Sequence, residues 1–363
     1  MMKKQKFIAA MSGGVDSTVA AALYHKIGHE VIGVTLRMKP QILDDKVSQS
    51  CCSTDDEIQA KMAADKLGIE HRIIESREDF YEKVLRKSWN EYRVGRTPNP
   101  CTVCNYLVKF AQLIEYAKEI GADGVITGHY AKIVKNDDGL YAIERGDDSN
   151  KDQTYFLYNL RQEQIAMVRF PVGDISKNEV REIARDFEFA NSEKKDSQDA
   201  CFLYEGHSFP ESLRLLFRQN PAKGSFVDEN GKVLGRHEGI HNYTIGQRKG
   251  LKIALGKPAY VKEIDGKSRA VTLTTDSDQL LKKSFFVHNI NYQSGIVRTK
   301  PFECLIQVRY RSKAVAGKVV PIGDGAIANV VLDAPVRAIT AGQSAVFYDG
   351  NTLLGGGVIS FDS

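Results

Sequence analysis

The first half of the chain alternates continuous apolar runs with segments whose apolar residues recur at helical spacing. The run KFIAAMS predicts a buried strand, and DSTVAAALYHKIG places Val19, Leu23 and Ile27 on one face of a helix that ends at Gly28. EVIGVTLRM, HRIIES and ADGVITGHYA predict further strands, and STDDEIQAKMAADKLG predicts a helix that ends at Gly68. Strands separated by such helices predict an α/β fold with a doubly wound parallel sheet and ligands at the carboxyl ends of the strands.

The pattern changes after about residue 205. Short apolar runs are cut by Gly, Asp and Asn, as in GSFVDENGKVLG, PAYVKEIDGKSRAVTLT, GAIANVVLD and SAVFYDGNTLLGGGVI, and the tripeptides ENG, IDG and YDG are typical of hairpin turns. We therefore predict three parts: the α/β domain over residues 1–205, a small, mainly β linker domain over 206–275, and a C-terminal β-barrel over 276–363.

Composition indicates an ordinary globular protein. The 363 residues are 42% apolar and 26% charged, a length typical of two or three domains. The run FIAAM is too short for a signal peptide, and no stretch approaches the ~20 apolar residues of a membrane span. We expect a cytoplasmic protein, in which the six cysteines remain thiols unless they are catalytic. They are Cys51, Cys52, Cys101, Cys104, Cys201 and Cys304.

The net charge of +4 lies entirely in the last part of the chain. Residues 281–363 hold nine Lys or Arg and five Asp or Glu, whereas residues 1–280 hold 41 of each sign. A basic module of this kind favours a nucleic-acid partner. A small barrel that lysines merely keep soluble explains the charge equally well.

The motif AMSGGVDS, Ala10 to Ser17, lies between a predicted strand and a predicted helix. Ser12, Gly13 and Gly14 allow backbone amides to approach a phosphate, and the helix directs its positive end at the same anion. The GxxxxGK[ST] motif is absent from the sequence, so no loop lysine reaches a γ-phosphate. This favours a pyrophosphate leaving group, with Asp16 for magnesium and Ser17 as a further donor. A glycine-rich turn without a ligand is the alternative.

The stretch RTPNPCTVCN places Cys101 and Cys104 three positions apart behind a Pro-Asn-Pro turn. A structural zinc needs four ligands, and the adjacent pair Cys51 and Cys52 has a poor chelating spacing. A resting disulfide is disfavoured in a reducing compartment. We expect the prolines to present Cys104 on a loop rather than in a core, and a nucleophile, alone or in a cluster, is the favoured interpretation.

The segment SGGVDS resembles the PP-loop of the ATP pyrophosphatases, which have an adenine nucleotide hydrolase-like fold. Together with TPNPCTVCN, GHYA, KDQTYFL, KKDSQDACF, YTIGQRKGL and VRYR, it resembles the tRNA-specific 2-thiouridylases. These pieces run from residue 10 to about residue 311 in the family's order, and AGQSAVFYDG near the end also fits. The resemblance implies ATP-dependent 2-thiolation of the wobble uridine, with ATP and Mg²⁺ as cofactors, the tRNA anticodon arm as partner, and a persulfide donor or relay protein.

Replacing a carbonyl oxygen with sulfur needs a better leaving group, which adenylation supplies, and a sulfur nucleophile. The resemblance implies Cys104 as the nucleophile and Cys201 as the persulfide carrier. Lys194 and Lys195 precede Cys201 and would favour its thiolate. Many family members have Asp at the position of Cys101 and Gly-Ile at Asp199 and Ala200. A [4Fe-4S] cluster on Cys101, Cys104 and Cys201, with one iron open to carry sulfide, therefore remains an alternative.

The resemblance also implies binding residues. ATP contacts are expected from Ala10, Met11, Ser12, Gly13, Gly14, Val15, Asp16, Ser17, Met38 and Gly128. Contacts to the target base or to tRNA are expected from Asn99, Pro100, Cys101, His129, Lys151, Asp152, Gln153, Arg309, Tyr310 and Gln343. A lysine favours phosphate, an amide reads a base edge, and an arginine beside a tyrosine suits a single-stranded anticodon loop.

Two other functions fit part of these observations. A PP-loop ligase that adenylates a small molecule would release pyrophosphate without tRNA, and it leaves the basic barrel unexplained. An RNA-binding module whose phosphate loop is only structural would bind tRNA independently of ATP, and Asp16 and Ser17 argue against it.

Overall fold

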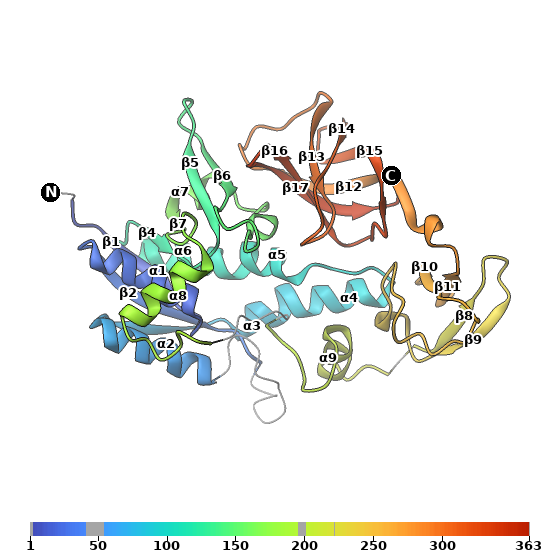
Figure 1. The fold of residues 1–363 in the computed structure, drawn as a ribbon, viewed down its shortest axis with the longest axis horizontal. Coiled ribbons are helices and arrows are strands. Elements are labelled where there is room, and N and C mark those ends of the chain that lie inside the picture. The colour runs from blue at the N-terminus through green and yellow to red at the C-terminus, as the bar shows by residue number, and fades with distance from the viewer. Residues whose placement is uncertain (1–2, 41–53, 195–200, 221, 363) are drawn as a thin grey trace.

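The computed structural model describes residues 3–40, 54–194, 201–220 and 222–362. Figure 1 shows the sheet of the α/β domain at one end, the small central domain at the other end, and the C-terminal barrel above the middle of the molecule. Cys51, Cys52, Lys195, Asp199 and Ala200 lie outside the described residues.

The first domain is built on a parallel sheet with strand order β3-β2-β1-β4-β7. Its strands are β1 (Lys6–Ala10), β2 (Glu30–Arg37), β3 (His71–Glu75), β4 (Gly124–Ile126) and β7 (Val168–Arg169). Successive residues of β1 enter different cores, with Phe7 on one face of the sheet and Ile8 on the other. Because helices cover both faces, the central strands β1 and β4 and most of β2 are buried, whereas the edge strand β3 (HRIIE) is partly exposed, with Ile73 44% exposed.

Helices α1 (Val15–Lys26), α2 (Thr54–Leu67) and α8 (Lys177–Asp186) contribute to the core that contains Phe7. The predicted apolar face of α1 is wrong at its end, because Ile27 is 53% exposed. Helix α1 packs against both α2 and α8, and its alanines Ala20, Ala21 and Ala22 are fully buried instead. Small side chains allow this close packing on several sides.

The other face of the sheet is covered by two helical segments, each with a π-helical turn. One contains α3 (Arg77–Phe80), the π-helical turn η2 (Tyr81–Arg86) and α4 (Lys87–Arg93), and the other contains α5 (Pro100–Cys104), the π-helical turn η3 (Asn105–Lys109) and α6 (Phe110–Glu119). Pro100 occupies the first turn of α5, where its missing N–H costs no hydrogen bond. Helix α5 therefore begins directly behind the Pro-Asn-Pro turn.

One hairpin leaves the first domain and extends the sheet of the barrel. Strands β5 (Ala131–Lys135) and β6 (Tyr141–Arg145) pair with each other, and Glu144 of β6 pairs with Thr352 of the barrel. The 3₁₀ helix η4 (Thr154–Phe156) and helix α7 (Gln162–Met167) follow. Periodicity along the chain did not predict this joint, because strand pairing across about 200 residues has no local sequence signal.

The central domain has a four-stranded sheet of order β10-β11-β8-β9. Its elements are α9 (Phe209–Leu216), β8 (Gly224–Val227), β9 (Val233–His237), η5 (Ile240–Asn242), β10 (Tyr260–Asp265), β11 (Ala270–Thr274) and η6 (Ser277–Leu280). The two predicted hairpins form, but β8 and β11 pair in parallel. Helix α9 was not predicted, and its Leu213 is buried against the core of the first domain.

The last domain is a closed barrel of strand order β12-β15-β14-β13-β16-β17, closed by the pairing of β12 with β17. Its strands are β12 (Leu281–Tyr292), β13 (Phe302–Gln307), β14 (Val315–Ile322), β15 (Ile327–Arg337), β16 (Ser344–Asp349) and β17 (Thr352–Ser360). The predicted fold class, a parallel α/β sheet followed by a mainly β domain and a barrel, is confirmed. None of the helices within the described ranges is long and apolar enough to cross a membrane.

Candidate active site

A pocket of about 450 Å³ opens at the carboxyl ends of β1, β2 and β4, where a doubly wound sheet is expected to bind its ligand. Most of the predicted nucleotide residues line it: Ala10, Met11, Ser12, Gly14, Val15, Asp16, Ser17, Met38 and Gly128. Two barrel residues, Tyr310 and Arg311, complete the lining. The pocket is therefore shared by the α/β domain and the barrel.

The loop between β1 and α1 has the shape of an anion cradle. The Ser12 amide donates to Ser17 Oγ over 3.2 Å, and Ser17 Oγ donates to the Gly14 carbonyl over 2.9 Å. Gly13 has φ +72°, and a Cβ atom there would lie 2.3 Å from the Asp56 carbonyl oxygen, so the backbone requires glycine. Gly14 is the N-cap of α1, which directs the positive end of that helix at the loop.

Gly128 allows the turn after β4 to lie directly on this loop. A Cβ atom at Gly128 would lie 2.6 Å from both the Asp16 carbonyl carbon and the Ser17 amide nitrogen. A side chain would therefore push the two strand ends apart and widen the pocket. This is a structural reason for the glycine, in addition to the nucleotide contact implied by the family resemblance.

Two lysines from distant parts of the chain reach the phosphate loop. Lys177 Nζ, on α8, donates to Asp16 Oδ1 over 2.6 Å, and the same oxygen accepts from the Tyr130 hydroxyl over 2.7 Å. Lys194 Nζ donates to the Gly13 carbonyl over 3.2 Å and forms an ion pair with Asp56. Lys194 and Asp56 both line the pocket. Sequence reasoning considered Lys194 only as a neighbour of Cys201, and missed Lys177 and Asp56.

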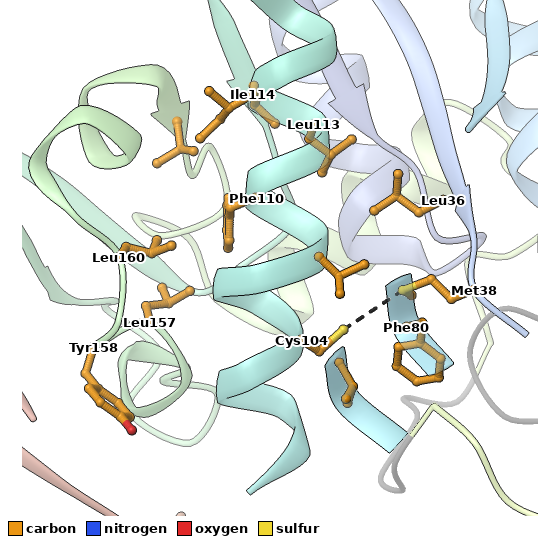
Figure 2. Packing of buried hydrophobic residues seen from close by; sticks show 14 of the residues in the cluster. Leu36, Met38, Phe80, Cys104, Phe110, Leu113, Ile114, Leu157, Tyr158 and Leu160 are labelled. Atoms are coloured by element: carbon orange, nitrogen blue, oxygen red, sulfur yellow. Dashed lines mark hydrogen bonds between the residues drawn. The ribbon is translucent and has the colours of Figure 1, made fainter. Parts of the chain in front are cut away.

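Cys104 is packed in the core, so the expectation of a loop-presented thiol is wrong. It is 4% exposed at the end of α5, and its Sγ lies 3.9 Å from Met38 Sδ among apolar side chains (Figure 2). Burial raises the pKa of the Cys104 thiol to about 12, against a lowering effect of Lys109. The prolines position the start of α5, but the following helical turn points this side chain inward.

Cys101 and Cys201 line the pocket and are partly exposed. Each of them also contributes to raising the pKa of Cys104, so both lie near that thiol. Within the described part of the chain, no three His, Cys, Asp or Glu side chains are arranged to hold a metal ion. Because Cys104 faces Met38, these thiols as placed do not form the ligand set of an iron–sulfur cluster.

His129 lines the pocket and packs against two aromatic rings. Its ring centroid lies 5.5 Å from that of Phe110 and 5.9 Å from that of Phe170, and Nδ1 lies 2.8 Å from Thr127 Oγ1. Burial, assisted by the charge of Lys109, lowers the pKa of His129 to about 3. The imidazole is therefore neutral at physiological pH and offers a flat face and hydrogen-bonding groups without charge.

Of the predicted base and tRNA residues, five line the pocket: Cys101, His129, Lys151, Gln153 and Tyr310. Asp152 instead forms an ion pair with Arg145, and its Oδ1 accepts from the Thr154 amide over 3.1 Å. The described contacts of Asp152 are therefore with neighbouring groups of the protein. A carboxylate would also repel a phosphate of tRNA.

The arginine that reaches the pocket is Arg311. The predicted residue, Arg309, donates from Nη2 to the Ala338 carbonyl over 2.7 Å and does not line the cavity. Tyr310 does line it, and its ring centroid lies 4.4 Å from that of Phe156. Arg311 has φ +66°, a left-handed conformation that redirects the chain. No sequence signal distinguished the two arginines.

Three family models match consecutive parts of the chain. They are described as the tRNA methyl transferase HUP domain (residues 5–205), the tRNA methyl transferase PRC-barrel domain (residues 215–275) and the aminomethyltransferase beta-barrel domain (residues 282–359).

Several relatives that match nearly the whole chain are named tRNA-specific 2-thiouridylase MnmA. The protein of Clostridium botulinum (strain Alaska E43 / Type E3) is 40% identical over 364 residues, which is 99% of this chain and 98% of the relative. The protein of Halothermothrix orenii is 39% identical over 358 residues, 98% of each chain. The protein of Carboxydothermus hydrogenoformans is 41% identical over 363 residues, again 98% of each chain.

Proposed function

Because this chain belongs to the family of tRNA-specific 2-thiouridylases, we propose that its pocket replaces the O2 oxygen of the wobble uridine in tRNA with sulfur. The chain is an ATP-dependent tRNA-thiolating enzyme. One observation carries the proposal for this site: the phosphate loop and the thiols Cys101 and Cys201 line the same cavity. Adenylation and sulfur transfer can therefore act on one base.

The nucleotide half of the pocket suits an ATP whose α-phosphorus is attacked. The loop amides and the positive end of α1 would bind the triphosphate, and Met38 and Gly128 would border the adenine. Mg²⁺ would neutralise phosphate charge, with Asp16 and Ser17 as oxygen donors in the cavity. Lys194 would add the cation that the loop itself lacks.

The base half is built from neutral and cationic groups. His129 would stack on or hydrogen-bond the uridine without adding charge, because its pKa is far below neutrality. Lys151 and Arg311 would contact phosphates, and Tyr310 offers a ring for stacking an unpaired nucleotide. These groups suit a base that has been flipped out of the anticodon loop.

Sulfur transfer would take place in three steps. The uridine O2 attacks the α-phosphorus of ATP, and pyrophosphate leaves. The terminal sulfur of a Cys201 persulfide then attacks C2, and AMP leaves with the original oxygen. Attack of the Cys104 thiolate on Cys201 Sγ releases the 2-thiouridine and forms a Cys104–Cys201 disulfide, which a dithiol reductant must reduce. Cys104 must leave its packing on Met38 for this last step.

Two alternatives predict different outcomes in the experiments below. The cluster route needs Cys104 as a ligand and, like the persulfide route, needs this buried thiol to leave its packing on Met38. A ligase for a small molecule has no need of the barrel residues Tyr310 and Arg311 at the pocket.

The test is thiolation by anaerobically purified protein supplied with ATP, Mg²⁺, a sulfur source and unmodified tRNA. Nucleoside mass spectrometry should detect 2-thiouridine, and both Cys104→Ala and Cys201→Ala should abolish it. Cys304→Ala is the matched control, because Cys304 lies on β13 of the barrel. Full thiolation by Cys104→Ala would remove the role given to that thiol.

Iron content and the absorbance of the same preparation separate the two sulfur routes. The persulfide route predicts full activity without iron and a persulfide on Cys201 in intact-mass spectra. Activity that follows bound iron and is lost in Cys101→Ser would instead support the cluster.

A further inference from the structure

The C-terminal barrel is bound to the turn that precedes the catalytic thiols. The Gln343 side-chain nitrogen Nε2 donates to the carbonyl oxygens of Thr97 and Pro98, over 3.0 Å and 3.2 Å. The Thr97 amide in turn donates to the Ala341 carbonyl over 2.9 Å. Gln343 and Thr97 are 246 positions apart in the sequence, so this contact belongs to the tertiary structure alone.

The barrel and the turn lie so close together that the size of the residues between them is restricted. Gly342 has φ +89°, and a Cβ atom there would lie 2.9 Å from the Thr97 carbonyl oxygen, so a larger residue would push the turn away. Thr97 also meets the central domain, because its Oγ1 lies 3.2 Å from Thr244 Oγ1. All three domains therefore converge on one residue of the turn.

Tyr155 connects this contact to the RNA-facing side of the pocket. Its hydroxyl donates to the Ser344 carbonyl of the barrel over 3.0 Å. The ring is fully buried, and its centroid lies 6.0 Å from that of Tyr310, which lines the pocket. Tyr155 therefore links the pocket residue Tyr310 to Ser344, the neighbour of Gln343 in the chain.

Helix α5 carries both Cys101 and Cys104 and is the first turn of the helical segment that continues through η3 and α6. Helix α6 at the far end of that segment packs against β1 and β4, whereas the position of the first turn also depends on the chain that precedes it. The turn before α5 is held by Gln343 of the barrel at Thr97 and Pro98, and by Thr244 of the central domain at Thr97.

We propose that Gln343 is a positioning residue for the thiols, which fixes the turn 97–99 and so transmits the seating of RNA on the barrel to Cys101 and Cys104. This proposal rests on the proposed function above. It differs from the family-based expectation that Gln343 contacts tRNA directly. Both N–H groups of the carboxamide are directed at protein carbonyls, so the contacts of Gln343 in the structure are with the turn.

The test compares Gln343→Glu, which keeps the size and removes both donors, with Gly342→Ala, which displaces the turn without altering a side chain able to read RNA. Gln279→Ala, on the surface of the central domain near Glu229, is the matched control. Thermal unfolding identifies the variants that fold. Gln343→Met, which removes the donors without adding charge, replaces Gln343→Glu if that variant does not fold.

We expect kcat for thiolation to fall about tenfold in both variants, while the Kd for unmodified tRNA stays within about twofold. We also expect Cys101 and Cys104 to be alkylated faster by iodoacetamide, because a released turn exposes α5. Alkylation needs neither ATP nor tRNA, so it reports on the turn even if thiolation itself is not observed.

A weaker tRNA Kd in Gln343→Glu, with unchanged thiol alkylation and a normal Gly342→Ala enzyme, would overturn the proposal in favour of a direct RNA contact. Unchanged kcat and alkylation in both variants would overturn it as well.

Discussion

The Sγ atom of Cys104 lies 3.9 Å from the Sδ atom of Met38, inside the apolar core of the first domain. The family resemblance assigns nucleophilic attack to this cysteine, yet burial raises the pKa of its thiol to about 12. A thiol with that pKa is protonated throughout the neutral range, and the thiolate is the nucleophile. Cys104 therefore has to move before it can react.

This relationship predicts an order of thiol reactivity. At neutral pH, iodoacetamide should modify Cys101 and Cys201, which line the pocket, well before Cys104. The rate at Cys104 should rise with pH only under strongly alkaline conditions, because its pKa is raised. Peptide mapping by mass spectrometry measures each rate. Addition of ATP and tRNA together should accelerate Cys104 if the complete substrate set releases it, and equal rates for all three thiols without substrates would contradict the buried placement.

His129 predicts a dependence of stability on pH. Its pKa falls from 6.5 to about 3 on folding, so the unfolded chain binds more protons between these values. The contribution of His129 is therefore complete above its unfolded pKa and decreases as the pH falls toward its folded pKa. Urea unfolding at neutral pH and at about pH 5 should show a smaller loss of stability in His129→Gln than in the unaltered protein. An identical loss in the two proteins would show that His129 does not titrate in this range on unfolding.

Lys194 predicts a specific defect in nucleotide binding. Removing one charge-assisted hydrogen bond to phosphate typically costs about 1.5–3 kcal/mol, so Lys194→Ala should weaken ATP binding roughly 10- to 100-fold. Calorimetric titration with a non-hydrolysable ATP analogue measures this. Lys66→Ala, which removes an exposed ion pair with Glu188, is the control and should bind normally.

The ion pair of Lys194 with Asp56 adds a second variant to that experiment. Asp56→Asn removes the competing carboxylate and keeps the lysine, so ATP should bind at least as tightly as in the unaltered protein. Weak binding in Asp56→Asn with normal binding in Lys194→Ala would assign the effect to the carboxylate instead.

Substitutions of the neighbouring residues Arg311 and Arg309 should have different effects. Arg311→Ala should weaken tRNA binding and reduce its salt dependence by about one phosphate contact, with little change in melting temperature. Arg309→Ala should lower the melting temperature, because the Ala338 carbonyl loses its donor. Filter binding over a range of salt concentrations and thermal unfolding measure the two effects. Exchanged phenotypes would restore Arg309 as the RNA contact.

The sequence by itself determined the features that depend on local chemistry. The run KFIAAMS, the SGG turn and the apolar start of the next helix predicted β1, the phosphate loop and α1, because each is fixed by residues within a few positions. The motif set predicted membership of the thiouridylase family and its tRNA-thiolating activity, and both predictions are confirmed. The hairpins of the central domain and the barrel followed from their turn residues.

Only the tertiary structure decided which side chains meet at the site. Lys194 and Asp56 flank Gly13 from positions 138 residues apart, and Gln343 holds Thr97 from a different domain. Periodicity could not place Cys104 in the core or select Arg311 over Arg309, because both outcomes depend on how distant elements pack. Local pattern specifies an element and its buried face, but burial against other elements determines the charge state and the partners of each side chain.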